Sequence, residues 1–247
     1  MGRFFIEKKD INAGEIVVSG REARHMIEVL RLAPGDNMVM FDGQGGEYSG
    51  KIKDVDRKKT SLTAIISKMK EKSNENGTLI TLAQAIPKKN KMDLIVEKAT
   101  ELGVHKIIPM ITDRTIVRPE ESLFNKMNGR WKRIAIEASK QCACAVTPSI
   151  DPITSFRDVI GAVKTYDLSM LACISHNTIP IKKAMPSPLP RNILVMIGPE
   201  GDFSEREVLQ AEDKKINLIS LGPRVLKSDT AGIFVVSVIG YEGGNIG

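Results

Sequence analysis

Two Gly-Pro turns follow short apolar stretches in the last third of the chain, at Gly198-Pro199 and at Gly222-Pro223. A polar loop, residues 174–177, follows a third apolar stretch, residues 168–174. Ligands of an open α/β sheet bind beyond the carboxyl ends of its strands, so we expect these three loops to form one site. Either Gly-Pro turn alone would be explained better as a simple reversal of the chain.

The spacing of these glycines argues against a phosphate-binding loop. Neither turn has the G-x-G-x-x-G or G-x-x-x-x-G-K-[ST] pattern that binds pyrophosphate. A nucleoside without phosphates suits the loops better, and S-adenosylmethionine, which carries a sulfonium instead, is such a ligand. Directly after the first turn, Ser204 and Glu207 have the spacing of a capping box, which predicts that a helix begins there.

The part of the chain that carries these loops alternates predicted strands with predicted helices. The expected strands are residues 78–86, 105–111, 168–174, 193–197 and 216–221. Apolar residues recur at helical spacing over residues 91–102, where Asn90 is the expected N-cap and Gly103 the expected end. A longer helix containing Trp131 is expected to run toward Cys142. This alternation predicts an α/β fold with a mainly parallel sheet.

Residues 1–70 instead consist mostly of short predicted strands, interrupted by one helix over residues 21–32. The sequence Asp42-Gly43-Gln44-Gly45-Gly46 predicts a hairpin, because its glycines allow the positive φ angles of tight turns. A small β-barrel is the expected product. Residues 68–77 are almost devoid of apolar side chains, as in a solvated linker, so the expected domains are residues 1–72 and residues 73–247.

Composition excludes several classes of protein. The 247 residues are 42% hydrophobic and 27% charged, which fits a folded protein and disfavours disorder. No apolar run approaches the roughly 20 residues of a membrane span, and the first residues lack the pattern of a signal peptide. Three cysteines and three histidines fit neither a disulfide framework, a zinc site nor a catalytic triad. We therefore expect a cytoplasmic protein without a metal.

The net charge is +6, and nearly all of the excess positive charge lies in the first 140 residues. A polyanion such as RNA would be attracted to that part of the chain. An ordinary solvated surface would explain the same charge. The candidate RNA-binding residues are Arg3, Arg21, Arg24, Arg31, Lys88 and Lys91.

Together the two Gly-Pro segments resemble a known family signature. They read Ile197-Gly-Pro-Glu-Gly-Asp-Phe-Ser-Glu-Arg-Glu207 and Leu221-Gly-Pro-Arg-Val-Leu-Lys-Ser-Asp-Thr-Ala231. Further short motifs match in order along the whole chain, among them Arg3-Phe4-Phe5, Phe41-Asp42-Gly43 and Glu97-Lys98-Ala99-Thr100-Glu101-Leu102-Gly103. This pattern is similar to that of the RsmE family of 16S ribosomal RNA uridine N3-methyltransferases.

The resemblance implies a PUA-like RNA-binding β-barrel in residues 1–72 and a SPOUT methyltransferase domain in residues 73–247. It further implies a C-terminal trefoil knot, a homodimer, S-adenosylmethionine as cofactor, and 16S ribosomal RNA or the small ribosomal subunit as partner. The expected cofactor-binding residues are Leu171, Ile174, Ile197, Gly198, Pro199, Glu200, Gly201, Leu221, Gly222, Leu226 and Thr230. Residues 232–239 are almost wholly apolar, which fits a C-terminal helix packed against its own sheet and a partner subunit, with Val236 at the interface. Complete burial of this helix inside one subunit would explain the same pattern.

Three residues are candidates for handling the substrate. Arg224 could donate to a uracil oxygen and favour the N3 anion, and Arg114 could hold a phosphate or the base. Glu137 could act as a base or orient the uridine. The structural alternatives are loop anchoring for Arg224, a salt bridge for Arg114, and a partner on its own helix for Glu137.

The sequence also departs from the family pattern. Asp202 stands where the family usually has glycine, which predicts a differently shaped loop because aspartate adopts positive φ less freely. Cys144 and Val146 stand where the family usually has arginines, so two expected RNA or substrate contacts are absent. Two other functions therefore stay open: a ribosomal RNA-binding assembly factor without catalysis, and a nucleotide-dependent enzyme of different chemistry.

Overall fold

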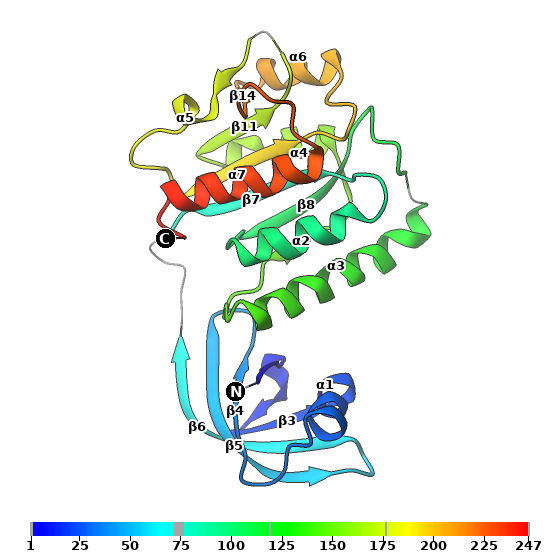
Figure 1. Ribbon diagram of the computed structural model, residues 1–247, viewed down its shortest axis with the longest axis vertical. Helices are drawn as coiled ribbons and strands as arrows, with labels where there is room; N and C mark the ends of the chain where they lie inside the picture. Colours follow the sequence, from blue (N-terminus) through cyan, green and yellow to red (C-terminus); the bar gives the residue numbers. More distant parts are fainter. Residues whose placement is uncertain (1, 72–76, 119, 176, 247) are drawn as a thin grey trace. The chain divides into compact units, whose positions relative to one another are not determined.

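The computed structural model describes residues 2–71, 77–118, 120–175 and 177–246 (Figure 1). The chain divides into two compact units. The first comprises Met1–Glu75 together with Ser139–Thr147, and the second comprises Asn76–Ala138 and Pro148–Gly247. The expected boundary between residues 72 and 73 lies outside the described residues.

The first unit is a six-stranded, mostly antiparallel sheet in the order β1-β4-β5-β6-β3-β2. Its elements are β1 (Arg3–Phe5), the short helix η1 (Lys8–Asp10), β2 (Ile11–Asn12), β3 (Glu15–Ser19), α1 (Gly20–Arg24), η2 (His25–Val29), β4 (Asn37–Phe41), β5 (Gly46–Asp56) and β6 (Ser61–Glu71). The predicted hairpin is present, since Asp42 accepts hydrogen bonds from the backbone N–H groups of Gln44 and Gly46. Buried residues such as Phe4, Ile16 and Met40 form its core.

Two boundaries in this unit differ from the sequence prediction. The helix predicted over residues 21–32 ends at Val29, because Arg31 adopts a φ of 55° that a right-handed helix cannot contain. The linker predicted from residue 68 begins later, because residues 68–70 of β6 pair with residues 47–49 of β5. Backbone pairing across a long hairpin thus outweighs the polar composition of this segment.

Residues 139–147 were not expected to belong with the first part of the chain. Val146 forms an isolated β-bridge with Gln44, and the backbone N–H of Gly45 donates to the carbonyl of Ala145 at 3.1 Å. The Arg3 guanidinium donates to the Cys144 carbonyl at 3.4 Å. The Asp42–Gly46 turn is therefore covered by a segment about a hundred residues later in the sequence.

The second unit is built on a parallel sheet in the order β10-β8-β7-β13-β11-β14-β12, with β9 also pairing with β8. Its strands are β7 (Leu79–Ala85), β8 (Lys106–Ile111), β9 (Ser149–Ile150), β10 (Thr154–Ser155), β11 (Leu168–Ala172), β12 (Ile179–Pro180), β13 (Asn192–Ile197) and β14 (Asn217–Ser220). Its helices are α2 (Lys91–Glu101), α3 (Glu121–Gln141), α4 (Phe156–Gly161), η3 (Val163–Thr165), α5 (Ile181–Ala184), α6 (Glu205–Asp213) and α7 (Ser228–Glu242). Every strand pair in it is parallel, as predicted.

Helices cover both faces of this sheet (Figure 1). Along β13, Ile193 and Val195 pack with residues of α2 and α7, whereas Leu194 and Met196 pack with residues of α4 and α6. Successive side chains of a strand point to opposite faces, so a strand buried on both sides is apolar throughout. This explains why β13 shows no alternation of polar and apolar residues in the sequence.

The two ends of α2 complete the comparison with the sequence. Gly103 has a φ of 77° and follows the end of α2, as predicted. Asn90 precedes α2, but its φ is 54° and its side chain makes no capping hydrogen bond. The predicted N-cap position is therefore confirmed, whereas the capping hydrogen bond of the side chain is absent. Among the described residues, no helix is long and apolar enough to cross a membrane.

Candidate active site

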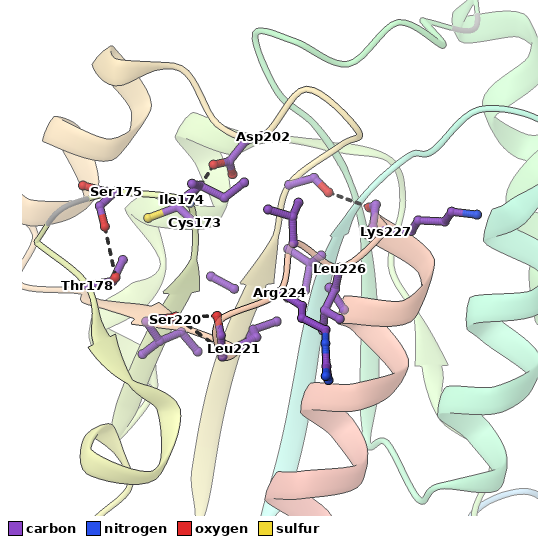
Figure 2. Close-up of a pocket in the computed structure, with 18 of the residues that line it drawn as sticks. Cys173, Ile174, Ser175, Thr178, Asp202, Ser220, Leu221, Arg224, Leu226 and Lys227 are labelled. Atoms are coloured by element: carbon purple, nitrogen blue, oxygen red, sulfur yellow. Dashed lines mark hydrogen bonds between the residues drawn. The ribbon is translucent and has the colours of Figure 1, made fainter.

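A pocket of about 420 Å³ lies at the carboxyl ends of β11, β13 and β14 (Figure 2). Its lining comes from three segments and from Ala231 of α7: residues 172–175 with Thr178, residues 197–200 with Asp202, and residues 219–228. His176, in the first of these segments, lies outside the described residues. The carboxyl ends of adjacent parallel strands meet at one edge, so three loops separate in sequence form one pocket there.

Segment 198–203 forms a tight turn, closed by a hydrogen bond of 3.0 Å from the N–H of Asp202 to the carbonyl of Pro199. Asp202 adopts a φ of 60°, in the left-handed region that glycine favours. A side chain at Gly198 would approach the ring of buried Phe203 to 3.2 Å. Close packing of the turn on that ring therefore favours a glycine at its start.

Asp202 also joins this turn to the neighbouring loop. Its carboxylate accepts a hydrogen bond of 2.8 Å from the backbone N–H of Ile174, drawn as a dashed line in Figure 2. The Asp202 and Glu212 carboxylates add to the effect of burial, which raises the pKa of the Cys173 thiol to about 12. The thiol beside this contact is neutral near pH 7 and is not a nucleophile there.

A buried polar network lies beneath the pocket. The Ser228 hydroxyl donates to the Gly198 carbonyl at 2.6 Å and accepts from the Gln84 amide at 2.9 Å. Gln84 itself is fully buried in β7 and donates its second hydrogen to the Ala85 carbonyl at 3.1 Å. Because Ser228 begins α7, the network links the first turn of that helix to the Gly-Pro turn at residue 198.

The β8–α3 loop, residues 112–118, is tied to the other side of the 198–207 segment. The Asp113 carboxylate accepts from the Ser204 hydroxyl at 2.6 Å and from the Arg206 guanidinium at 2.7 Å. These hydrogen bonds, that of Ser204 foremost, lower the pKa of the Asp113 carboxyl, so it stays ionised at neutral pH. The Arg114 guanidinium, next in sequence, donates to the Gly201 carbonyl at 2.9 Å.

Two contacts join the start of α2 to the same region. Glu200 accepts a hydrogen bond of 3.0 Å from the backbone N–H of Lys88, and the Lys91 ammonium pairs with the Asp229 carboxylate at 2.9 Å. The ion pair lies across the first turns of α2 and α7, because Lys91 begins α2 and Asp229 is the second residue of α7.

Comparison with known proteins identifies the family of this chain. The RNA methyltransferase domain family matches residues 74–240, and the RNA methyltransferase PUA domain family matches residues 18–65. Ribosomal RNA small subunit methyltransferase E of Bacillus subtilis is 30% identical over 98% of this chain and 97% of its own length. The chain belongs to the ribosomal RNA small subunit methyltransferase E family.

Solved structures agree over nearly the full length. The methyltransferase E of Neisseria gonorrhoeae, bound to S-adenosyl methionine, is 28% identical with a TM-score of 0.84 and covers 97% of this chain and 96% of its own. A methyltransferase of Legionella pneumophila, in complex with the cofactor SAM, is also 28% identical, with a TM-score of 0.86 and 96% coverage of each chain.

The pocket contains most of the residues that the sequence assigned to the cofactor of a methyltransferase E. Those lining it are Ile174, Ile197, Gly198, Pro199, Glu200, Leu221, Gly222 and Leu226. Leu171, Gly201 and Thr230 are not among its lining residues. A side chain at Gly201 would lie 3.6 Å from the Arg114 side chain, so this glycine faces Arg114.

The three substrate candidates have different positions. Arg224 lines the pocket, and Arg114 lies beside Gly201 at the back of the Gly-Pro turn. Glu137 is exposed on α3 and is not among the lining residues of the pocket.

The RNA candidates also differ in their surroundings. Arg3 pairs with Glu47, lies 5.1 Å above the Phe41 ring, and has a side chain only 14% exposed, which favours an internal role. Lys91 is occupied by Asp229. The exposed cations are Arg21, Arg24, Arg31 and Lys88, and Arg24 lies 3.8 Å from Glu28.

Sequence reasoning missed Gln84 and Asp113. It also missed the hydrogen bond that the Glu207 carboxylate accepts from the backbone N–H of Asp113. The signal for Gln84 was a polar residue inside the apolar stretch 78–86, since a buried amide needs partners. No comparable signal marked Asp113, because its partners lie about ninety residues away in the sequence.

Proposed function

We propose that this methyltransferase transfers the methyl group of S-adenosylmethionine to N3 of a uridine in 16S ribosomal RNA. The observation that carries the proposal is the pocket formed by both Gly-Pro turns, in a chain related over nearly its full length to methyltransferase E proteins. Two relatives of known structure are bound to the same cofactor.

The residues present fit that cofactor. The cavity of about 420 Å³ is within the range of small-molecule sites. Ile197, Ile219 and Leu226 give it apolar walls for a nucleoside, and Ser220 and Thr178 add hydroxyls. No P-loop or dinucleotide motif enters it, which fits a ligand without phosphates. When bound, S-adenosylmethionine supplies an electrophilic methyl group on its sulfonium.

The protein's contribution would be positioning and electrostatics. Arg224 at the pocket can donate to a uracil oxygen and stabilise the negative charge that develops when N3 loses its proton. Arg114, held beside Gly201, can bind the base or a neighbouring phosphate. Both roles need the uridine to leave its stack and enter the site. Glu137 is left out of this scheme, because it is not among the pocket's lining residues.

The proposal extends to the first unit, which would hold ribosomal RNA through Arg21, Arg24 and Arg31. Its support is the match to the RNA methyltransferase PUA domain and the exposure of these cations. Binding should weaken as salt rises, because phosphate contacts release counterions. We also propose a cytoplasmic location, because the proposed substrate is ribosomal RNA.

A homodimer is also proposed, with α7 at the interface. Phe234 and Tyr241 are 36% and 71% exposed on this largely apolar helix. Val236, by contrast, is fully buried in the chain's own core, so the expectation that a charge there would test the interface was wrong. Light scattering should give twice the 27.2 kDa of one chain, and Phe234→Asp should lower that mass.

The SPOUT topology with a C-terminal knot, which the family resemblance implies, is proposed as well. β14 pairs with β11. The helix that follows β14 in sequence, α7, packs instead on β7 and β13. A crystal structure of the protein would decide, by showing whether residues 221–247 thread through the loop that precedes β13.

The activity is tested with purified protein, labelled S-adenosylmethionine and small ribosomal subunits from a strain that lacks the enzyme. Label should enter 16S ribosomal RNA, and mass mapping should locate one methyl group on a uridine base. Binding of S-adenosylmethionine without transfer would instead support an assembly factor. Calorimetric binding of ATP but not of S-adenosylmethionine would support a nucleotide-dependent enzyme.

A further inference from the structure

We propose that Asp202 is a positioning residue of the cofactor pocket, whose carboxylate holds the loop after β11 in the binding conformation. The inference rests on the proposed function, because it takes the ligand of the pocket to be S-adenosylmethionine.

The backbone at Asp202 is the first part of the argument. Its φ of 60° is one that glycine adopts without strain and that aspartate tolerates better than most residues. The turn that requires it is fixed at 3.0 Å by the hydrogen bond to Pro199. A glycine would therefore serve the turn as well or better, so the turn itself does not explain the side chain.

The end of β11 is the second part. The last backbone hydrogen bond to the sheet in this segment is donated by Cys173 to the carbonyl of Ile219, at 3.2 Å. The next N–H, that of Ile174, has left the sheet and donates to the Asp202 carboxylate at 2.8 Å. Asp202 thus attaches the loop to the β13 side of the pocket one residue beyond the strand.

The exposure of Ile174 is the third part. Its side chain is 70% exposed, so apolar packing contributes little to holding this residue in place. Yet Ile174, Ser175 and Thr178 line the pocket. Figure 2 shows Asp202 directly beside Ile174 at this wall. The hydrogen bond from the Ile174 N–H to the Asp202 carboxylate is therefore a contact that joins this wall to the β13 side of the pocket, and such charge-assisted bonds are stronger than neutral ones.

Three variants of the full-length protein separate the possible roles. Asp202→Gly removes the carboxylate and relieves the backbone, whereas Asp202→Asn keeps an oxygen that can accept from Ile174 and removes the charge. Lys215→Gly is the matched control, because Lys215 also has a positive φ, of 58°, and is exposed away from the pocket. It gains the same backbone freedom without losing a contact to the pocket.

The measurements are the Kd for S-adenosylmethionine by calorimetry and hydrogen exchange of the peptide that contains Ile174. Asp202→Gly should raise the Kd about tenfold and speed exchange at Ile174, the effect of losing one charge-assisted hydrogen bond. Asp202→Asn should restore most of the affinity and most of the exchange protection at Ile174. Lys215→Gly should match wild type in both measurements. In methyl transfer, Asp202→Gly should raise KM for the cofactor with little change in kcat.

Wild-type affinity and exchange in Asp202→Gly would overturn the proposal. A loss of affinity in Asp202→Asn as large as in Asp202→Gly, with slow exchange retained at Ile174, would also overturn it, since the charge itself would then act on the ligand. If wild type bound no S-adenosylmethionine, the proposed function would fail. The exchange experiment would still report whether Asp202 holds Ile174.

Discussion

The Glu207 carboxylate accepts a hydrogen bond of 2.8 Å from the backbone N–H of Asp113, in the loop that follows β8. Its second oxygen accepts from the backbone N–H of Ser204, also at 2.8 Å. Glu207 is only 2% exposed. One buried carboxylate therefore caps α6 and fixes the residue before Arg114. The location of Arg114 thus depends on a side chain that is not among the lining residues of the pocket.

Replacing Glu207 by glutamine should destabilise the protein. The amide nitrogen cannot accept from a backbone N–H, so one buried donor loses its partner at a cost of about 1–3 kcal/mol. Urea unfolding measures the loss. Glu205→Gln, an exposed change in the same first turn, is the control and should leave stability within about 0.5 kcal/mol. Equal stability of the two variants would show that the double contact contributes nothing.

Replacing Arg114 by alanine should lower kcat/KM for ribosomal RNA by about 10-fold to 100-fold, because a positioned cation is lost near the base. The Kd for S-adenosylmethionine should stay near wild type, since Arg114 is not among the residues that line the pocket. The kcat/KM of Arg114→Lys for ribosomal RNA should fall between those of wild type and Arg114→Ala. Arg157→Ala, at an exposed position of α4, controls for the loss of one surface charge. A large change in cofactor Kd would instead make Arg114 part of the cofactor site.

Replacing Gly232 by alanine should destabilise the fold, although alanine is the better helix former. The new Cβ would lie 2.4 Å from the Gln84 side-chain oxygen, which is buried and has no hydrogen-bond partner among the described residues. Overpacking of this kind costs about 1–3 kcal/mol. Gly129→Ala in α3 is the matched control, because a Cβ there meets no atom within 4 Å, and it should stabilise by roughly 0.5–1 kcal/mol. Thermal unfolding of both variants decides whether this contact or helix propensity dominates.

Cys173 should resist alkylation at neutral pH. Burial raises its pKa to about 12, so the reactive thiolate is scarce at pH 7 and increases only as the pH approaches that value. Cys142 and Cys144 are only half-buried and should be modified first. Mass spectrometry after brief iodoacetamide treatment, native and in urea, measures the order. Rapid native labelling of Cys173 would mean that the pocket wall opens readily.

The sequence predicted the parallel sheet and the three loops because both depend on local patterns. An apolar run such as residues 193–197 and a Gly-Pro turn directly after it are visible without knowing the fold. The capping box of Ser204 and Glu207 is local in the same way, and the structure confirms it.

Contacts between distant residues could not be predicted in this way. The partners of Asp113 and Gln84 lie far along the chain, and their pairing depends on the order of strands in the sheet. Asp202 was recognised as unusual, but its role depends on Ile174, whose N–H becomes available only where β11 leaves the sheet. Polar residues beside a predicted site are thus detectable, whereas their partners are not.

Residues 139–147 have a consequence for the order in which a newly synthesised chain can fold. The first unit includes this segment, so the hairpin at Asp42–Gly46 cannot gain its contacts to Ala145 and Val146 until α3 has been made. A growing chain that ends before residue 147 therefore carries an unfinished N-terminal unit while the other unit has begun to form. Domains usually complete folding in the order of their synthesis, but here the first unit cannot be completed until part of the second has been made.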